Sequence, residues 1–417
     1  MSPLPECSAS LSRLPPYLFV KLNAVKEEAV RRGRRLIDLG MGNPDRPTPV
    51  HVVDALCRAI REDPSTHRYP TTRGSPALRR AIADWYARRF DVRLDPETEV
   101  LPLLGSKEGL AHLFFAYLER SDYAVIPSPC YPVHYNGALL AGARLHLLPL
   151  TEANGFLPDL AAVPGAVARK AKVLVLNYPN NPTGAVLPDL SLFREAIAFA
   201  RKAGGFVVHD NAYSELAFDG YRAPSFLQAP GAKRFGVEFH SFSKSYSMAG
   251  WRVAFAAGSA ELLSSLAKFK SFVDYGVPGF IQAAAAAALT GSQDYVLQIS
   301  EIYRQRRDAL VAALAEAGWP ARAPRATMYL WARLPEPFRR AGSFAFCESL
   351  LLREGVVLAP GVGFGPHGEG YVRFAFVEDE RRIQEAVGRI GRFLKAARPG
   401  RRPAAKAGRS VLLAEHY

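Results

Sequence analysis

The amino-acid sequence predicts an α/β protein whose large domain has a mostly parallel sheet covered by helices on both faces, with a smaller α+β domain beside it. In the middle of the chain, short runs that are apolar throughout alternate with amphipathic helical patterns; they span residues 173–177, 206–210, 237–244 and 253–258. Strands without polar alternation are buried on both faces, as in a helix-covered parallel sheet. After about residue 290 a long helical pattern leads into shorter strands at 327–334 and 371–377, which indicates the second domain.

Three helices of the large domain have clear start or stop signals in the sequence. Ser75 and Pro76 provide an N-cap and a first-turn proline for a helix that buries Leu78, Ile82, Trp85 and Tyr86. We expect Ser106 to cap a second helix, and a third to run from about Ser191 to the glycine pair at 204–205. The predicted organisation is an N-terminal arm contributing to the small domain (1–46), a large domain (47–285), a C-terminal small domain (286–397) and a basic, disordered tail (398–417).

The composition is that of a globular protein, with 417 residues, 49% hydrophobic and 22% charged. No apolar run approaches the ~20 residues of a membrane span, and the N-terminus lacks the pattern of a secretory signal. Four scattered cysteines show neither metal-ligand spacing nor a disulfide framework. We therefore expect a cytoplasmic protein that binds neither metal nor membrane.

The net charge of +14 raises the question of nucleic-acid binding. Residues 398–410 carry five cations and no acid among prolines, glycines and alanines, a composition typical of a solvated tail. We therefore expect no nucleic-acid partner.

Polar groups follow three of the predicted strands where ligands bind in open α/β sheets, beyond the carboxyl ends. Asn181 follows the first strand, Asp210 ends the second with Tyr213 close behind, and Lys244 ends the third. Lysine forms Schiff bases with aldehydes, and a carboxylate can keep a pyridine nitrogen protonated. The amide of Asn181 and the hydroxyl of Tyr213 can donate to a phenolate oxygen. The order of these groups predicts a site for an aldehyde-bearing pyridine cofactor.

A phosphate site accompanies them. Gly105 and Ser106 open a helix whose free N–H groups attract an anion. Ser241 and Ser243 flank the third strand end, and Arg252 lies eight residues after Lys244.

In these motifs the sequence resembles the fold-type-I aminotransferases of classes I and II. The resemblance is carried by NNPTG (180–184), HDNAY (209–213) and SFSKSYSMAGWR (241–252), and it extends from about Leu14 to Leu394. It implies a large-domain sheet of the seven-stranded type, pyridoxal 5'-phosphate as cofactor, a Schiff base on Lys244, and a homodimer. The implied catalytic residues are Lys244, Asp210 and Tyr213. The implied cofactor contacts are Ser106, Lys107, Tyr131, Asn181, Asp210, Tyr213, Ser241, Ser243, Lys244 and Arg252, with Tyr69 reaching the phosphate of the neighbouring subunit.

The resemblance also implies a substrate site. Arg373 matches the arginine that clamps the substrate α-carboxylate, and Gly42 offers a backbone contact to the same group. Tyr131, Asn181 and Tyr17 complete the implied substrate contacts.

Within the family, the sequence is most similar to bacterial alanine (glutamate–pyruvate) aminotransferases and their LL-diaminopimelate relatives. Gly276 stands where LL-diaminopimelate enzymes place an asparagine, which weakens the assignment to LL-diaminopimelate. The sequence does not name the substrate pair, and alanine and glutamate with pyruvate and 2-oxoglutarate are one candidate. The implied activity is ping-pong transfer of an amino group between an L-amino acid and a 2-oxo acid. A pyridoxal-phosphate-dependent lyase or synthase on the same fold is the alternative. A transcription regulator on this fold needs an N-terminal DNA-binding domain, for which the first ~15 residues leave no room.

Overall fold

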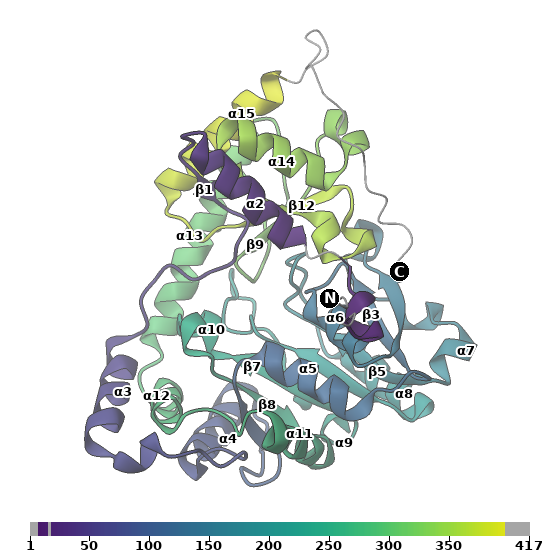
Figure 1. The fold of residues 1–417 in the computed structure, drawn as a ribbon, viewed down its shortest axis with the longest axis vertical. Helices are drawn as coiled ribbons and strands as arrows, with labels where there is room; N and C mark the ends of the chain where they lie inside the picture. The colour runs from purple at the N-terminus through teal and green to yellow at the C-terminus, as the bar shows by residue number, and fades with distance from the viewer. Residues whose placement is uncertain (1–6, 16–17, 397–417) are drawn as a thin grey trace, which may run out of the picture.

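The central element of the protein, in a computed structural model that describes residues 7–15 and 18–396, is a seven-stranded sheet (Figure 1). Its strand order is β2-β8-β7-β6-β5-β3-β4. The strands are β2 Val100–Leu103, β3 Tyr123–Ser128, β4 Arg144–Pro149, β5 Ala171–Leu176, β6 Phe206–Asp210, β7 Gly236–Ser241 and β8 Ala254–Gly258. β4, β3, β5, β6 and β7 are mutually parallel, and β8 is antiparallel to both β7 and β2. The mostly parallel sheet predicted from the apolar runs is confirmed.

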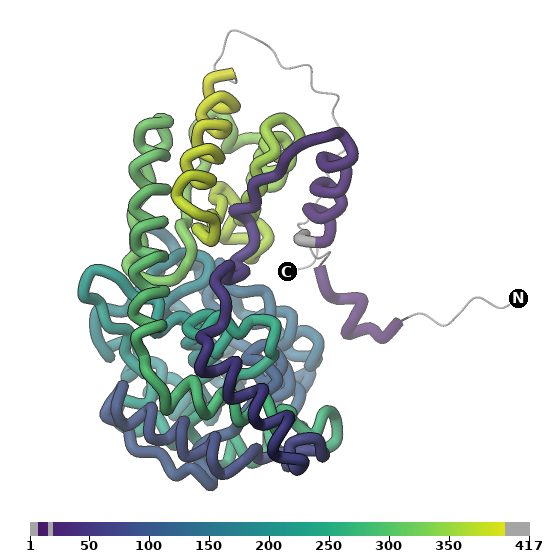
Figure 2. The backbone as a smooth tube through the Cα atoms, turned by 90° about the vertical axis from the view of Figure 1, so that its left-hand side faces the viewer, coloured from purple at the N-terminus to yellow at the C-terminus, as the bar shows by residue number. Residues whose placement is uncertain are grey.

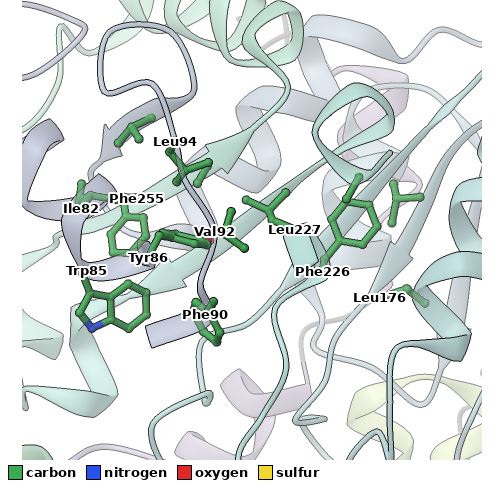
Figure 3. Close-up of a cluster of buried hydrophobic side chains, with 14 of the residues drawn as sticks. Ile82, Trp85, Tyr86, Phe90, Val92, Leu94, Leu176, Phe226, Leu227 and Phe255 are labelled. Atoms are coloured by element: carbon green, nitrogen blue, oxygen red, sulfur yellow. The ribbon is translucent and has the colours of Figure 1, made fainter. Parts of the chain in front are cut away.

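Helices bury both faces of this sheet, which explains why its strands are apolar throughout. Successive residues of a strand point to opposite faces, and β5 shows this directly. Val173 and Val175 pack into the cluster under α5 (Ser106–Tyr117), α6 (Val133–Leu140) and α11 (Ala260–Val273). Leu174 and Leu176 pack into the cluster on the opposite face, with α4 (Pro76–Phe90), α8 (Ser191–Ala203) and α12 (Gly279–Thr290). Part of this second cluster is drawn in Figure 3.

Two predicted helix boundaries are confirmed. The Ser75 hydroxyl accepts a hydrogen bond from the N–H of Leu78 and caps α4, which begins at Pro76. Gly204, with φ 69°, ends α8 in the left-handed conformation that glycine adopts without a steric penalty.

Two predictions about where a helix begins and where a strand ends are wrong. Ser106 does not cap α5, because Gly105 is the N-cap and Ser106 is the first helical residue. The turn needs φ 101° at Gly105, and this shifts the helix start by one residue. Lys244 does not end a strand: β7 stops at Ser241, whose hydroxyl accepts from the N–H of Ser243 and starts the short helix α10 (Phe242–Ser245). Lys244 therefore extends from a helical turn just beyond the sheet.

The upper part of the molecule in Figure 1 is the smaller α+β region. A three-stranded antiparallel sheet has the order β11 (Ala359–Pro360), β12 (Tyr371–Ala375), β9 (Tyr329–Arg333). The helices of this region are α13 (Asp294–Glu316), α14 (Ser343–Glu354) and α15 (Glu380–Ala396). The predicted second region is confirmed, whereas the boundaries at residues 46, 285 and 397 stay a proposal, and the tail at 398–417 lies outside the described residues.

The N-terminal segment packs against this smaller region, as expected. β1 (Ile37–Asp38) pairs in parallel with β10 (Val356–Val357), and α2 (Leu18–Arg31) buries Leu22 and Ala29 against α14. Figure 2 shows the dark purple chain beside the yellow and green helices before it descends to α3 (Val50–Glu62). The remaining helices are short: α1 Ala9–Ser12, α7 Gly165–Ala168 and α9 Ala232–Phe235. Within residues 7–15 and 18–396, no helix combines the length and the apolar character that crossing a membrane requires.

Candidate active site

A pocket of about 240 Å³ lies at the carboxyl ends of β5 and β6, beside α10 and the start of α5. The structure brings together there every predicted site residue except Tyr17 and Tyr69; those present are Gly42, Ser106, Lys107, Tyr131, Asn181, Asp210, Tyr213, Ser241, Ser243, Lys244, Arg252 and Arg373. Tyr17 lies outside the described residues. Tyr69 is on the surface, with 88% of it exposed.

Lys244 reaches into this pocket from α10. Its Nζ donates a 2.7 Å hydrogen bond to the carbonyl oxygen of Gly42, and no carboxylate among the described residues forms an ion pair with it. Burial lowers the pKa of the Lys244 amine, and the charges of Arg373 and Arg252 lower it further, whereas Tyr329 acts in the opposite direction. A lysine with a lowered pKa has a larger fraction of free amine, which is the form that attacks a carbonyl carbon.

Asp210, the last residue of β6, has one carboxylate oxygen bonded and one free. His134 Nε2 lies 3.0 Å from Oδ2, so the imidazole holds the carboxylate in place. Oδ1 is buried and has no hydrogen-bond partner among the described residues. A buried acceptor without a partner costs about 1–3 kcal/mol, so the site is built for a donor that a ligand brings.

Asn181 and Tyr213 line the same pocket as Asp210. The Asn177 side chain fixes this arrangement, because it donates to the carbonyl of Asp210 at 2.7 Å and accepts from the N–H of Asn181 at 2.9 Å. The Asn181 Oδ1 accepts from Arg373, which leaves its amide N–H groups directed to the pocket. The Tyr213 hydroxyl lies 3.1 Å from that of Tyr329.

The other end of the pocket is rich in donors. The first N–H groups of α5 open here, next to the side chains of Ser106, Lys107, Ser243 and Arg252. Arg252 has a left-handed backbone (φ 54°) and donates to the carbonyl of Ala249. A Cβ on Gly105 would lie 2.5 Å from Nη2 of Arg252, so a larger residue here would push this guanidinium away from the helix start. Free backbone N–H groups, hydroxyls and cations together make an anion site.

Arg373 on β12 lies across the pocket and is almost fully buried. Its two terminal nitrogens donate to Asn181 Oδ1 at 2.7 Å and to the carbonyl of Gly40 at 2.8 Å. The guanidinium also stacks on the ring of Tyr329, 3.9 Å from its centroid. Its position is therefore fixed by neutral groups, and its charge has no carboxylate partner among the described residues.

Comparison with known proteins decides the family. The family model described as "Aminotransferase class I and II" matches residues 34–390. This chain belongs to the class I and II aminotransferases. It is 49% identical over 384 residues to the LL-diaminopimelate aminotransferase of Moorella thermoacetica, covering 92% of this chain and 97% of the relative. It is 45% identical over 386 residues to the glutamate-pyruvate aminotransferase AlaC of Escherichia coli, covering 93% of each chain.

The fold of the aminotransferase matches solved structures as well. A substrate-bound structure of BacF from Bacillus subtilis superposes with a TM-score of 0.89 at 38% identity, covering 94% of this chain and 98% of that one. The predicted activity, pyridoxal-phosphate-dependent amino transfer, is confirmed by this family membership. The alternative of a lyase or synthase finds no support among these relatives, whose names are those of aminotransferases.

The residues of the pocket fit pyridoxal 5'-phosphate. The unpartnered Oδ1 of Asp210 suits a protonated ring nitrogen, and the donor-rich end beside Gly105 suits a phosphate. Lys244 lies in the same pocket, where the aldehyde needs an amine. Three independent features of the aminotransferase thus match three different parts of one cofactor.

The sequence interpretation missed two residues that line the aminotransferase pocket, Tyr329 and Asn177, and also His134, which holds Asp210 without lining the pocket. Tyr329 matters most, because it contacts Arg373 and Tyr213 together. Burial would raise its pKa, but the charges of Arg373 and Lys244 outweigh that and lower it. Its only sequence signal is an aromatic residue in an apolar strand, which is indistinguishable from a core residue.

Tyr329 also changes the explanation for Gly42. We expected glycine there so that the backbone could approach a carboxylate. In the structure a Cβ at Gly42 would overlap the hydroxyl of Tyr329, so packing of this tyrosine already requires glycine.

Proposed function

We propose that the aminotransferase works through Lys244 as nucleophile and base, with Asp210 and Tyr213 as its other catalytic residues. The observation that carries this proposal is the position of the Lys244 amine, in one pocket with the unpartnered Asp210 oxygen and with Arg373. When bound, pyridoxal 5'-phosphate supplies an aldehyde for the substrate amino group and a ring that withdraws electrons from the Cα–H bond.

Each side chain has a separate proposed task toward the cofactor. Asp210 keeps a proton on the ring nitrogen, and His134 orients that carboxylate. Asn181 and Tyr213 donate to the 3-oxygen, and Tyr131 covers a ring face. The phosphate is held by the donor-rich end of the pocket, formed by Ser106, Lys107, Ser241, Ser243 and Arg252.

Toward the substrate, Arg373 binds the α-carboxylate and Lys244 moves the proton of Cα. The fork of an arginine matches the two oxygens of a carboxylate, and binding this group fixes the orientation of the Cα–H bond. Gly42, Tyr131, Asn181 and Tyr17 complete the proposed contacts to the substrate. The lowered pKa of Lys244 makes its free amine a suitable base at neutral pH. The first product leaves before the second substrate binds, which is the ping-pong order.

Spectroscopy on the loaded enzyme tests this cycle. Addition of glutamate alone removes the ~420 nm absorbance of the cofactor, one equivalent per site, and later addition of pyruvate restores it. Release of ammonia and a 2-oxo acid without restoration by pyruvate is the outcome expected of a lyase, and it would contradict the proposal.

For the substrates we propose alanine and glutamate with pyruvate and 2-oxoglutarate. One relative is named for glutamate and pyruvate and the other for LL-diaminopimelate, at similar identity. Gly276 has φ 122°, a backbone conformation that an asparagine with its Cβ adopts only under strain. An asparagine at this position would therefore strain the turn as it stands in this chain. Values of kcat/KM for alanine, glutamate and LL-diaminopimelate check the choice, and a preference for LL-diaminopimelate would overturn it.

We also propose a cytoplasmic homodimer in which Tyr69 serves the neighbouring active site. Tyr69 is 88% exposed and its ring packs against that of Tyr275, with centroids 5.4 Å apart. An aromatic ring held outward by a second ring is typical of a residue that contacts a partner chain.

Mixing of two inactive variants tests the shared site. Tyr69→Phe is used at a cofactor concentration that leaves it largely empty, and Lys244→Ala lacks the nucleophile. Random reassortment of equal amounts makes about half the dimers mixed, each with one intact site, so roughly a quarter of wild-type activity returns. Verified mixed dimers without activity would exclude the contribution of Tyr69.

A further inference from the structure

A second cavity, of about 420 Å³, lies on the far side of the chain segment that follows Tyr213. It is enclosed by α4, by residues 214–222 and by the start of α13, and it shares no lining residue with the cofactor pocket. Cavities of about 300–1,000 Å³ are the usual size of small-molecule sites. The proposed chemistry of amino transfer uses none of its side chains.

Trp85 forms the base of this cavity. Only 7% of Trp85 is exposed, and its ring packs edge-on against those of Tyr86, Phe90 and Phe255. The indole N–H has no hydrogen-bond acceptor among the described residues, and in Figure 3 the nitrogen points away from the labelled apolar side chains. Buried indoles ordinarily donate to an acceptor. The indole nitrogen is not fully buried, so it faces the cavity, which therefore offers a directed donor that no described residue uses.

The polar lining of the cavity consists largely of donors. Ser214 is also almost fully buried, and its hydroxyl makes no hydrogen bond within the described chain. Arg222 is exposed and makes neither an ion pair nor a hydrogen bond there, and Arg88 uses one nitrogen for the carbonyl of Leu289. Arg89 is bound to Glu215 at 3.0 Å, so this pair is neutral. Two guanidinium charges remain without an acid, which selects an anion.

The opposite wall is apolar. Val296 and Leu297 on α13 line the cavity, and Leu297 is 69% exposed. An inorganic anion would leave this wall in contact with water, whereas a ligand with an apolar body covers it.

From these features we propose that the cavity is a second ligand site for a small organic carboxylate with an apolar body. The carboxylate binds between Arg88 and Arg222 and accepts from the indole N–H of Trp85. Arginine suits this role because its planar fork matches the two carboxylate oxygens. The apolar body of the ligand lies against Val296 and Leu297.

The test uses 4-(4-fluorophenyl)butanoate, which has no amino or oxo group, with the cofactor-loaded enzyme. Titration followed by fluorine NMR gives saturable binding, and the neutral amide of the same probe does not bind. Arg88→Gln combined with Arg222→Gln weakens binding about 10-fold or more, since hydrogen bonds to charged groups are lost. Arg80→Gln, an exposed arginine on the same helix outside the cavity, is the matched control and leaves binding unchanged.

Two further variants separate this site from the active site. Trp85→Phe keeps the ring and removes the N–H, and it weakens binding several-fold while thermal unfolding confirms the fold. Arg373→Ala leaves binding of the probe unchanged. Loss of binding in Arg373→Ala, equal binding in the Arg88 and Arg222 double variant, or equal binding of the neutral amide would each overturn the proposal. All of these outcomes are independent of which amino acids the enzyme uses.

Discussion

Two buried carboxylates on neighbouring strands of the sheet, Glu238 on β7 and Asp210 on β6, have opposite surroundings. Glu238 accepts hydrogen bonds from the side chains of His209, His240, Tyr86 and Ser225 and from the N–H of Phe226. Asp210 has one imidazole partner and a buried oxygen that contacts no donor in the part of the chain that the structure describes. Both are nearly or fully buried, so burial alone does not distinguish them.

Two lysines, Lys270 and Lys244, differ in the same way in how their charges are paired. Lys270 is fully buried and its Nζ lies within 3.1 Å of carboxylate oxygens of Glu108 and Asp274. Within residues 7–15 and 18–396, the only acceptor for the Lys244 amine is a backbone carbonyl. A buried charge whose partners are all within the protein stabilises the fold, whereas one with a partner missing marks the place of a ligand. The predictions below test this distinction.

Lys244→Ala has the largest expected effect. The variant loses amino transfer and the borohydride-reducible link to the cofactor, because the nucleophilic amine is gone. Among the described residues, Lys107 is the one other lysine that lines the pocket. Absorbance and steady-state assays measure the loss. Lys268→Ala, an exposed lysine on α11, is the control and keeps full activity. A reducible link that persists in Lys244→Ala would place the nucleophile elsewhere.

Asp210→Asn is next. The amide cannot stabilise a proton on the ring nitrogen, so kcat falls by about 10³-fold or more while the cofactor stays bound. Turnover and cofactor titration are measured together. The exposed Asp84→Asn on α4 serves as control. Near-wild-type turnover of Asp210→Asn would show that its free oxygen has no role in catalysis.

Arg373→Ala acts on the substrate and spares the cofactor. We expect a loss of about 3–5 kcal/mol in kcat/KM for amino acids and 2-oxo acids alike, since their carboxylate loses its buried partner. The cofactor absorbance stays unchanged. Arg333→Ala on the paired strand β9, where the side chain is exposed, is the control. Unchanged KM values in Arg373→Ala would assign the carboxylate to another cation.

Glu238→Gln has the smallest expected effect on turnover and acts on stability. Burial alone would raise the pKa of Glu238, but the hydrogen bonds from His209 and His240 outweigh it and hold the pKa well below the ordinary value of 4.5. The variant loses about 3–5 kcal/mol of unfolding free energy at neutral pH, the cost of breaking a buried ionic network.

The pH dependence of that loss follows from the lowered pKa. The contribution of Glu238 is fully present above its ordinary pKa and declines as the pH falls toward the folded-state pKa. The difference between the wild type and Glu238→Gln therefore shrinks below about pH 4.5, as denaturant unfolding at several pH values measures. A difference that grows on acidification would contradict the assigned network, and Glu261→Gln, exposed on α11, gives the baseline.

The sequence by itself determined four strands of the central sheet (β5, β6, β7 and β8), the helix boundaries at Ser75 and Gly204, and the polar groups that follow three of these strands. These features are local: apolar runs, caps and short motifs are fixed by neighbouring residues, so they can be read without knowledge of the fold. The clustering of Asn181, Asp210 and Lys244 could be predicted because the strands before them are parallel and end at one edge of the sheet.

Only the tertiary structure decided the rest. Tyr329 reaches the pocket because β9 pairs with β12 in a register that sets Tyr329 opposite Ala375 and close to Arg373, and a register between distant segments has no local signal. The contacts of His134 and Asn177 with Asp210 could not be predicted for the same reason, because they join residues that are distant in the sequence. The state of each buried charge was also invisible, since Glu238 and Asp210 look alike in sequence and differ only in the donors that folding brings around them.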